Sequence, residues 1–183
     1  MSRLLVLLER VFIVVIIDLL KFYIMKQVRG IRNNNPANIM RGSAWKGLVP
    51  FLVDKTNNQK YYDKRFAQFS EMVYGVRALL VVLRTYHYKY KLNTISKVIH
   101  RFAPLSENNT YEYIANVCKW MTEEYNIEGL IGIYYVQDDA PFCWFTNPKT
   151  PSFACLCLAK AICKQESGFE LSDTLLADAV KLL

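Results

Sequence analysis

Glu166 is the residue whose setting best suits acid chemistry. It follows the apolar stretch ACLCLAKAICKQ, which we expect to be helical, and Ser167, Gly168 and Phe169 come directly after it. A carboxyl group that leaves a buried helix where the backbone turns is partly withdrawn from water, and this favours the protonated form that a general acid needs. The alternative interpretation is an ordinary exposed glutamate at a helix C-terminus, with Gly168 as the capping residue.

Glu107 is the second candidate acid, and it lies in the polar segment APLSENNTYEY. Thr110 and Tyr111 follow closely, and their hydroxyl groups can hydrogen-bond a ligand or hold the carboxylate. The segment also has the composition of a helix start, in which Asn108 or Asn109 caps the helix and Glu107 favours the positive end of the helix dipole. Both acids therefore stay candidates, alone or together.

Four asparagines in the segment RGIRNNNPANI, residues 29–39, predict a polar turn. Their amides compete for backbone hydrogen bonds, and Pro36 disfavours helix at the residue before it. Because an amide both donates and accepts, these side chains also suit the hydroxyl and amide groups of a ligand. Asparagine is equally favoured in turns that are purely structural, so that alternative stays open.

Apolar spacing predicts the elements that must position these side chains. Residues 68–90 have hydrophobic side chains at intervals of three and four, which is typical of an amphipathic helix. Loops with a small sheet are expected over residues 28–58, and a strand or irregular segment over residues 129–147. The other helices are expected over residues 94–102 with Asn93 as cap, from Thr110 onward, over 153–165, and after Ser172 as cap.

Residues 4–25, LLVLLERVFIVVIIDLLKFYIM, are long and apolar enough to predict a membrane-spanning helix. Asp18 near its middle costs about 2.5 to 3.5 kcal/mol on the insertion scale, unless a lysine one turn away neutralises it. The alternative is a buried helix, but Glu9 and Asp18 fall on opposite sides and leave no single polar face. We therefore predict a membrane anchor over residues 1–26 and one domain over residues 27–183.

The formal net charge of +7 lies mainly outside residues 1–26, since the remainder still carries +5. Such a surface attracts nucleic acid, anionic lipid or the acidic peptides of a cell wall alike. The run YHYKYK at residues 86–91 can form a stacking platform for bases, but it continues a helix and no other feature supports nucleic acid, which is not expected as a partner. Two histidines and no CxxC pair leave no plausible ligand set for a metal, and no cofactor is expected.

Several separated motifs, in this order, resemble a family of phage virion proteins and endolysins described as structural or lysozyme-like. They are RGIRNNNPANI, Trp45-Lys46-Gly47, RFAQF, GVRALL, LNTI, RFAP, ENNTYEYI and AICKQESG, and they extend from Arg29 to Gly168. Ala37 stands where the first motif of that family usually has glycine. AICKQESGF is also similar to the segment around the catalytic glutamate of goose-type lysozymes and soluble lytic transglycosylases.

The resemblance implies an α+β, mostly helical, lysozyme-like fold. In the lysozyme-like relatives the glutamate comes early and the polar turn follows it, whereas here the turn comes early and Glu166 comes late. The implied fold is therefore a circularly permuted version, preceded by the predicted transmembrane helix. Such an arrangement requires the two distant ends of the domain to meet at one site.

The activity implied by the resemblance is cleavage of peptidoglycan, by a lytic transglycosylase or a muramidase, during phage entry or lysis. One acid can suffice when the substrate's acetamido group attacks or the sugar closes on itself, so Glu166 is the first candidate and Glu107 the second. The groups expected to bind the glycan, by hydrogen bonds or by stacking, are Asn33, Asn34, Asn35, Asn38, Trp45, Thr110, Tyr111 and Ser167.

The resemblance also implies a location in the virion and action in the host periplasm or cell wall. The expected partners are peptidoglycan, other virion proteins, and a viral or host membrane through residues 4–25. Two alternatives stay open. One is a non-catalytic, membrane-anchored structural protein of the virion with a wall-binding lysozyme-like domain, and the other is an amidase or endopeptidase that cuts the peptides of the wall.

Overall fold

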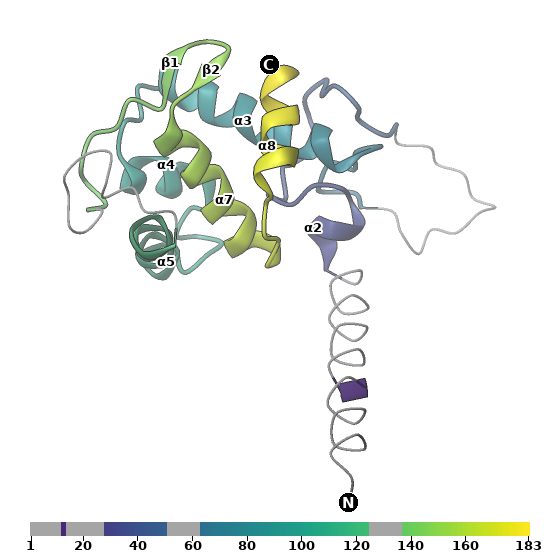
Figure 1. Cartoon of the computed structure of the whole chain (residues 1–183), viewed down its shortest axis with the longest axis horizontal. Helices are drawn as coiled ribbons and strands as arrows, with labels where there is room; N and C mark the ends of the chain where they lie inside the picture. Colours follow the sequence, from purple (N-terminus) through teal and green to yellow (C-terminus); the bar gives the residue numbers. More distant parts are fainter. Residues whose placement is uncertain (1–11, 14–27, 51–62, 125–136) are drawn as a thin grey trace, which may run out of the picture.

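The structure, a computed structural model, describes residues 12–13, 28–50, 63–124 and 137–183. In the last three ranges, helices pack around a shared apolar core, and a short antiparallel hairpin lies at one end of them (Figure 1). The helices are α2 (Arg29–Arg32), α3 (Met72–Tyr88), α4 (Ile95–Phe102), α5 (Thr110–Glu123), α7 (Phe153–Ser167) and α8 (Asp173–Lys181). The hairpin strands are β1 (Phe145–Asn147) and β2 (Thr150–Pro151).

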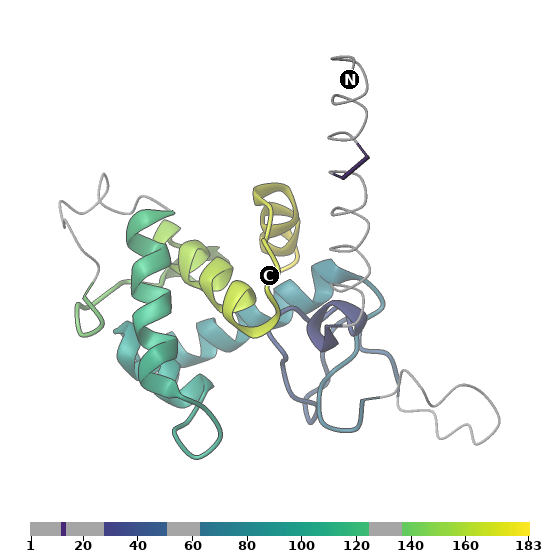
Figure 2. The same cartoon turned by 90° about the horizontal axis from the view of Figure 1, so that it is seen from below.

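Helix α7 lies in the middle of the core because apolar side chains cover most of its circumference. Its buried residues are small or of medium size, and they include three cysteines and two alanines. Small side chains at a contact let neighbouring helices approach closely. As Figures 1 and 2 show, α5 packs along α7, while α3 contacts both α7 and α8, and α4 packs against α5.

Side-chain caps define where several helices begin. Thr94 accepts a hydrogen bond from the backbone N–H of Lys97 and caps α4, in place of the predicted Asn93. Ser172 caps α8 as predicted, by accepting from the N–H of Leu175. Helix α7 ends at Gly168, which has a φ of 63° and therefore a left-handed conformation that glycine adopts without strain.

The asparagine turn and residues 63–70 form the second part of the fold. Isolated antiparallel bridges pair Met40 with Phe66 and Leu48 with Phe69. In this region, where a small sheet was expected, the described residues form these two bridges instead of a sheet. The turn sits directly on α3, because the backbone oxygen of Asn34 occupies the space where Gly75 has no side chain. The turn is therefore fixed against the helical core before any ligand binds.

The predicted fold class, a lysozyme-like α+β fold with an N-terminal transmembrane helix, is wrong. The described residues form a mixed helical fold with one two-stranded sheet, and no helix among them is long and apolar enough to cross a membrane. The predicted anchor, residues 4–25, lies outside the described residues except for Phe12 and Ile13. The prediction gave weight to an apolar run that four charged side chains interrupt, each of which is costly inside a bilayer.

Gly75→Ala should destabilise the fold by about 3 kcal/mol or more, because overpacking forces backbone to move. A Cβ at this position would lie 2.0 Å from the carbonyl oxygen of Asn34. Gly168→Ala is the matched comparison, since its Cβ would meet no atom within 4 Å and only the positive φ opposes it. That variant should lose about 1 kcal/mol. Urea unfolding of both variants measures the difference, and equal losses would contradict the close contact between the turn and α3.

Candidate active site

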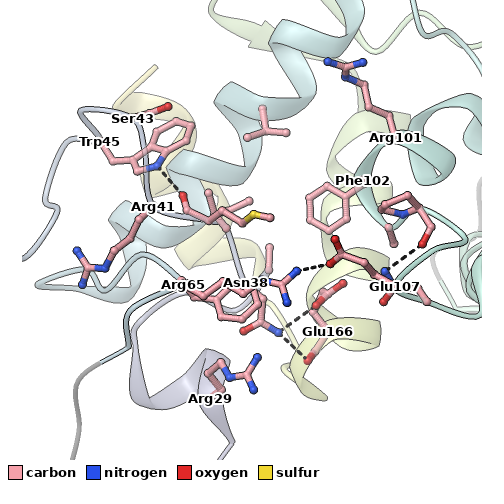
Figure 3. A pocket seen from close by; sticks show the side chains of 18 of the residues that line it. Arg29, Asn38, Arg41, Ser43, Trp45, Arg65, Arg101, Phe102, Glu107 and Glu166 are labelled. Atoms are coloured by element: carbon pink, nitrogen blue, oxygen red, sulfur yellow. Dashed lines mark hydrogen bonds and ion pairs between the residues drawn. The ribbon is translucent and has the colours of Figure 1, made fainter. Parts of the chain in front are cut away.

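A cleft of about 560 Å³ lies between the asparagine turn and the helical core. One wall comes from residues 37–45 together with Arg65 and Phe66, and the other from α3, α4 and the loop that follows α4. The C-terminal end of α7 forms part of the lining. Glu166 and Glu107 both line this cleft, as Figure 3 shows, although they are far apart in the sequence.

Glu166 is held in the cleft by hydrogen bonds from two sides. The side-chain amide of Asn38 donates to Oε2 of Glu166 at 3.0 Å and to its backbone oxygen at 3.2 Å (Figure 3). The hydroxyl group of Tyr113, from α5, donates to Oε1 at 3.2 Å. The carboxyl group therefore has a defined orientation, which is set by residues from two segments that are distant from it in the sequence.

Burial raises the pKa of Glu166 above its usual value. The hydrogen bonds from Asn38 and Tyr113 and the positive charge of Arg29 act in the opposite direction, but they offset burial only in part. Burial also raises the pKa of Tyr113 well above its ordinary range, with a further contribution from the neighbouring Glu166, so its hydroxyl group stays protonated and donates. The site thus contains a partly buried carboxyl group whose protonated form is favoured.

The turn and the helix end that carry Asn38 and Glu166 are joined by further contacts. The hydroxyl group of Ser167 donates to the backbone oxygen of Pro36 at 2.8 Å and to that of Cys163 at 3.0 Å. A Cβ on Gly30 would lie 2.8 Å from the Cβ of Ser167, so α2 approaches the end of α7 closely. Ser167, predicted to bind a ligand, is buried and fixes the backbone around Glu166 instead.

Glu107 has a different environment from that of Glu166. Its carboxylate is paired with the guanidinium group of Arg65 across the cleft, and about half of each side chain is exposed, 48% and 55% respectively. Of the two candidates, Glu166 is therefore the enclosed carboxyl group with a raised pKa, and Glu107 is the half-exposed one in an ion pair.

A network of charged side chains lies next to the cleft near Glu166. Arg29 lies over the ring of Phe66 at 4.7 Å and within 3.6 Å of the carboxylate of Asp63. Burial raises the pKa of Asp63, but backbone N–H groups of Phe66 and Arg65, the amide of Asn33 and the charge of Arg29 outweigh it, so that its pKa lies below the usual value. Asp63 thus holds Arg29 in place beside Glu166.

The remaining predicted site residues divide between the cleft and the framework. Trp45 lines the cleft, and its indole N–H donates to the backbone oxygen of Met40 at 3.3 Å. The framework residues have side chains directed to other parts of the protein. Asn33 donates to Asp63, Asn34 to the backbone of Phe69 and Ser70, Asn35 to Ile39 and Ala67, and Thr110 to Ala103. Tyr111 is 67% exposed and contacts His100 outside the cleft.

Sequence reasoning missed Tyr113, Arg29, Arg65 and Arg101. A signal for Tyr113 was present, because it lies on the same apolar face of its helix as Ile114 and Val117 and thus had to point into the core. The arginines carried no such signal, since surface and cleft arginines look alike in a sequence. Only the fold brings them to the same cavity.

Four of the five cysteines are buried and are poor candidates for nucleophiles. Burial raises the pKa of Cys118 to about 12 and that of Cys157 to about 11, and it places the pKa values of Cys155 and Cys163 higher still. A thiol of this kind is inert because the thiolate is the reactive form. Within the part of the chain that the structure describes, no three His, Cys, Asp or Glu side chains converge as a metal site would require.

Comparison with known proteins places the chain near a phage protein. Over 95 residues it is 41% identical to Protein P5 of Pseudoalteromonas phage PM2. The chain is a homologue of a phage protein. The similarity covers 50% of this chain and 54% of that relative, so the chain spans about half the length of the protein it matches. The predicted relation to phage proteins is confirmed at this level, and no protein-family model matches the sequence.

The raised pKa of Glu166 predicts how stability depends on pH. Between the usual pKa of 4.5 and the folded-state pKa, the unfolded chain releases a proton that the folded chain keeps, so stability falls as pH rises through this window. Glu166→Gln cannot titrate and should lack this component. Urea unfolding of both proteins from about pH 4 to pH 8 measures the difference, because the other ionisable groups are common to both. A difference that grows in the opposite direction would contradict a raised pKa of Glu166 in the folded protein.

Proposed function

We propose that this protein is a peptidoglycan-cleaving enzyme of a phage particle, of the lytic transglycosylase or muramidase type. The observation that carries the proposal is the largely enclosed carboxyl group of Glu166, which Asn38 and Tyr113 hold in a cleft and whose pKa burial raises. An acid of this kind is what cleavage of a glycosidic bond needs first, because the leaving oxygen must be protonated.

The chemistry can proceed with Glu166 as the single acid. Its proton passes to the glycosidic oxygen as the bond from that oxygen to the sugar's C1 breaks. The resulting carboxylate then accepts a proton from the group that attacks C1. In a lytic transglycosylase this group is the sugar's own 6-hydroxyl, which closes an anhydro ring, and in a muramidase it is water. Both routes return Glu166 to its protonated form.

The charge of the cleft also suits this substrate. Arg29, Arg41, Arg65 and Arg101 line it, against Glu107 and Glu166. Peptidoglycan carries carboxylate groups on its muramic acid or on its peptides, and a basic cleft attracts a polymer of this charge. The aromatic side chains in the lining, Trp45, Phe66, Tyr86 and Phe102, provide apolar faces of the kind that pack against sugar rings.

Glu107 has a supporting role in this proposal. Its ion pair with Arg65 joins the loop after α4 to the segment that follows the asparagine turn, and therefore spans the cleft. The pair is half exposed and so contributes little to stability, about 0 to 1 kcal/mol for pairs of this type. It can therefore separate or shift when a polymer enters, at little cost.

The phage relative supports the biological part of the proposal. A phage must open the wall of its host during entry or lysis, and a location in the virion is consistent with homology to Protein P5 of Pseudoalteromonas phage PM2. The proposed partners are accordingly the host's peptidoglycan and the neighbouring proteins of the particle.

Glu166→Gln should lower the rate of peptidoglycan cleavage by a factor of about a hundred or more, as expected for loss of a general acid. Release of soluble fragments from purified sacculi measures the rate, and mass spectrometry identifies the products. Anhydro ends indicate a lytic transglycosylase, reducing ends a muramidase, and free peptides an amidase or endopeptidase. Glu107→Gln should retain activity within a few-fold of the wild type.

Glu170→Gln is the matched control, because Glu170 is an exposed acid near Glu166 that pairs with Lys164 and does not line the cleft. This variant should be fully active. Release of free peptides only, or equal activity of wild type and Glu166→Gln, would overturn the proposal, and an inactive wild type would favour a non-catalytic role in the particle.

Tyr113→Phe should move the alkaline limb of the activity profile to higher pH. The Tyr113 hydroxyl group stabilises the ionised form of Glu166, so its removal raises the pKa of the acid further and keeps it protonated to higher pH. The pH dependence of kcat/KM measures this shift. Tyr111→Phe is the control, because Tyr111 is exposed and contacts His100 rather than Glu166. A limb that moves to lower pH would contradict the assignment.

A further inference from the structure

The cleft that contains Glu166 continues into a second hollow of about 600 Å³. Trp45, Tyr86 and Arg101 line both, so the two form one groove that runs from the end of α7 to Tyr90, just beyond α3. Figure 3 shows Arg101 at the opposite end of the first cleft from Arg29, with Glu166 between them in this view. A ligand long enough to extend from Glu166 into the second hollow therefore passes Arg101.

Arg101 is held in place by aromatic stacking. Its guanidinium carbon lies 3.6 Å from the ring centre of Tyr90 and 5.5 Å from that of Tyr86, and these two rings meet edge to face at 6.3 Å. Stacking of this kind restricts a flexible arginine and leaves its N–H groups directed outward in the plane of the guanidinium. The side chain is therefore ordered before a ligand binds.

Arg101 differs from two other arginines of the groove in having no acidic partner. Arg29 is close to Asp63, and Arg65 is paired with Glu107. Within the described residues, no carboxylate lies within ion-pair distance of Arg101. Burial raises the pKa of Tyr86 more than Arg101 lowers it, so that phenol stays neutral and does not neutralise the arginine. The positive charge is thus available to an anion from outside.

We propose that Arg101, supported by Tyr86 and Tyr90, binds a carboxylate group of the glycan substrate while Glu166 acts on the neighbouring glycosidic bond. A planar guanidinium binds a carboxylate through two parallel hydrogen bonds, and the rings beside it offer an apolar face for a sugar. The carboxylate of Glu107 in the same groove disfavours a continuous polyanion, whereas a glycan with separated carboxylates fits. This inference rests on the proposed function and names the feature of the substrate that is recognised.

Binding to the full-length Glu166→Gln protein tests the inference without turnover. Three probes show which carboxylate Arg101 binds. They are neutral oligomers of N-acetylglucosamine, peptide-free glycan strands that carry lactyl carboxylates, and strands with intact peptides. Calorimetry should show that adding Arg101→Ala weakens binding of one or both acidic probes about tenfold, as expected for a charged hydrogen bond. Binding of the neutral oligomers should change less than twofold.

Two further variants distinguish recognition from a structural role. Tyr90→Leu removes the stacking platform and should reproduce the selective loss, and Arg101→Lys should restore affinity only in part because it lacks the planar fork. Lys97→Ala is the control, since it removes one positive charge from the same helix at a residue that lines neither hollow.

The outcomes separate this inference from the proposed function. If Arg101→Ala weakens the binding of all three probes equally, or of none of them, the proposed carboxylate site is wrong. The proposal that Glu166 cleaves the glycan then still stands. If the Glu166→Gln protein binds none of the glycans and the wild type cleaves none, both the proposed function and this inference fail.

Discussion

The contact between the asparagine turn and the C-terminal end of α7 is the interaction on which the cleft depends. Asn38 donates to both the side chain and the backbone of Glu166, and the Ser167 hydroxyl group donates to Pro36, across separations of 128 and 131 residues. The contact is possible because Gly30 and Gly75 leave space for the backbone of the turn. One set of polar contacts therefore closes the fold, orients the candidate acid and withdraws it from water.

Two opposing effects set the protonation of Glu166, and their balance depends on the supporting groups. Burial favours the neutral form, whereas Asn38, Tyr113 and Arg29 favour the ionised form. Arg29 also lies close to the carboxylate of Asp63. The negative charge of Asp63 therefore weakens the effect of Arg29 on the pKa of Glu166. A carboxyl group with this balance can donate a proton and, in its ionised form, keep hydrogen-bond donors that stabilise it.

The sequence predicted the helices and their caps better than the roles of individual residues at the site. The helices from Met72, Thr110 and Phe153 were predicted because apolar spacing is encoded locally, and Ser172 was recognised as a cap for the same reason. The asparagines were harder, because an amide that binds a ligand and one that closes a turn are the same residue type. Of the four, only Asn38 contacts Glu166. The predicted membrane helix over residues 4–25 lies almost entirely outside the described residues, and no helix among the described residues is long and apolar enough to cross a membrane.

The contacts around the cleft differ in how easily they are broken, and this bears on the size of the ligand. The wall formed by the turn and α7 is fixed by buried hydrogen bonds, such as those of Asn35 and Ser167, which are costly to break. Across the cleft, Arg65 and Glu107 meet in a half-exposed ion pair that water can replace. When the Arg65–Glu107 ion pair separates, the cleft can admit a long polymer next to the firmly held Glu166. It does so without disturbing the geometry of Glu166.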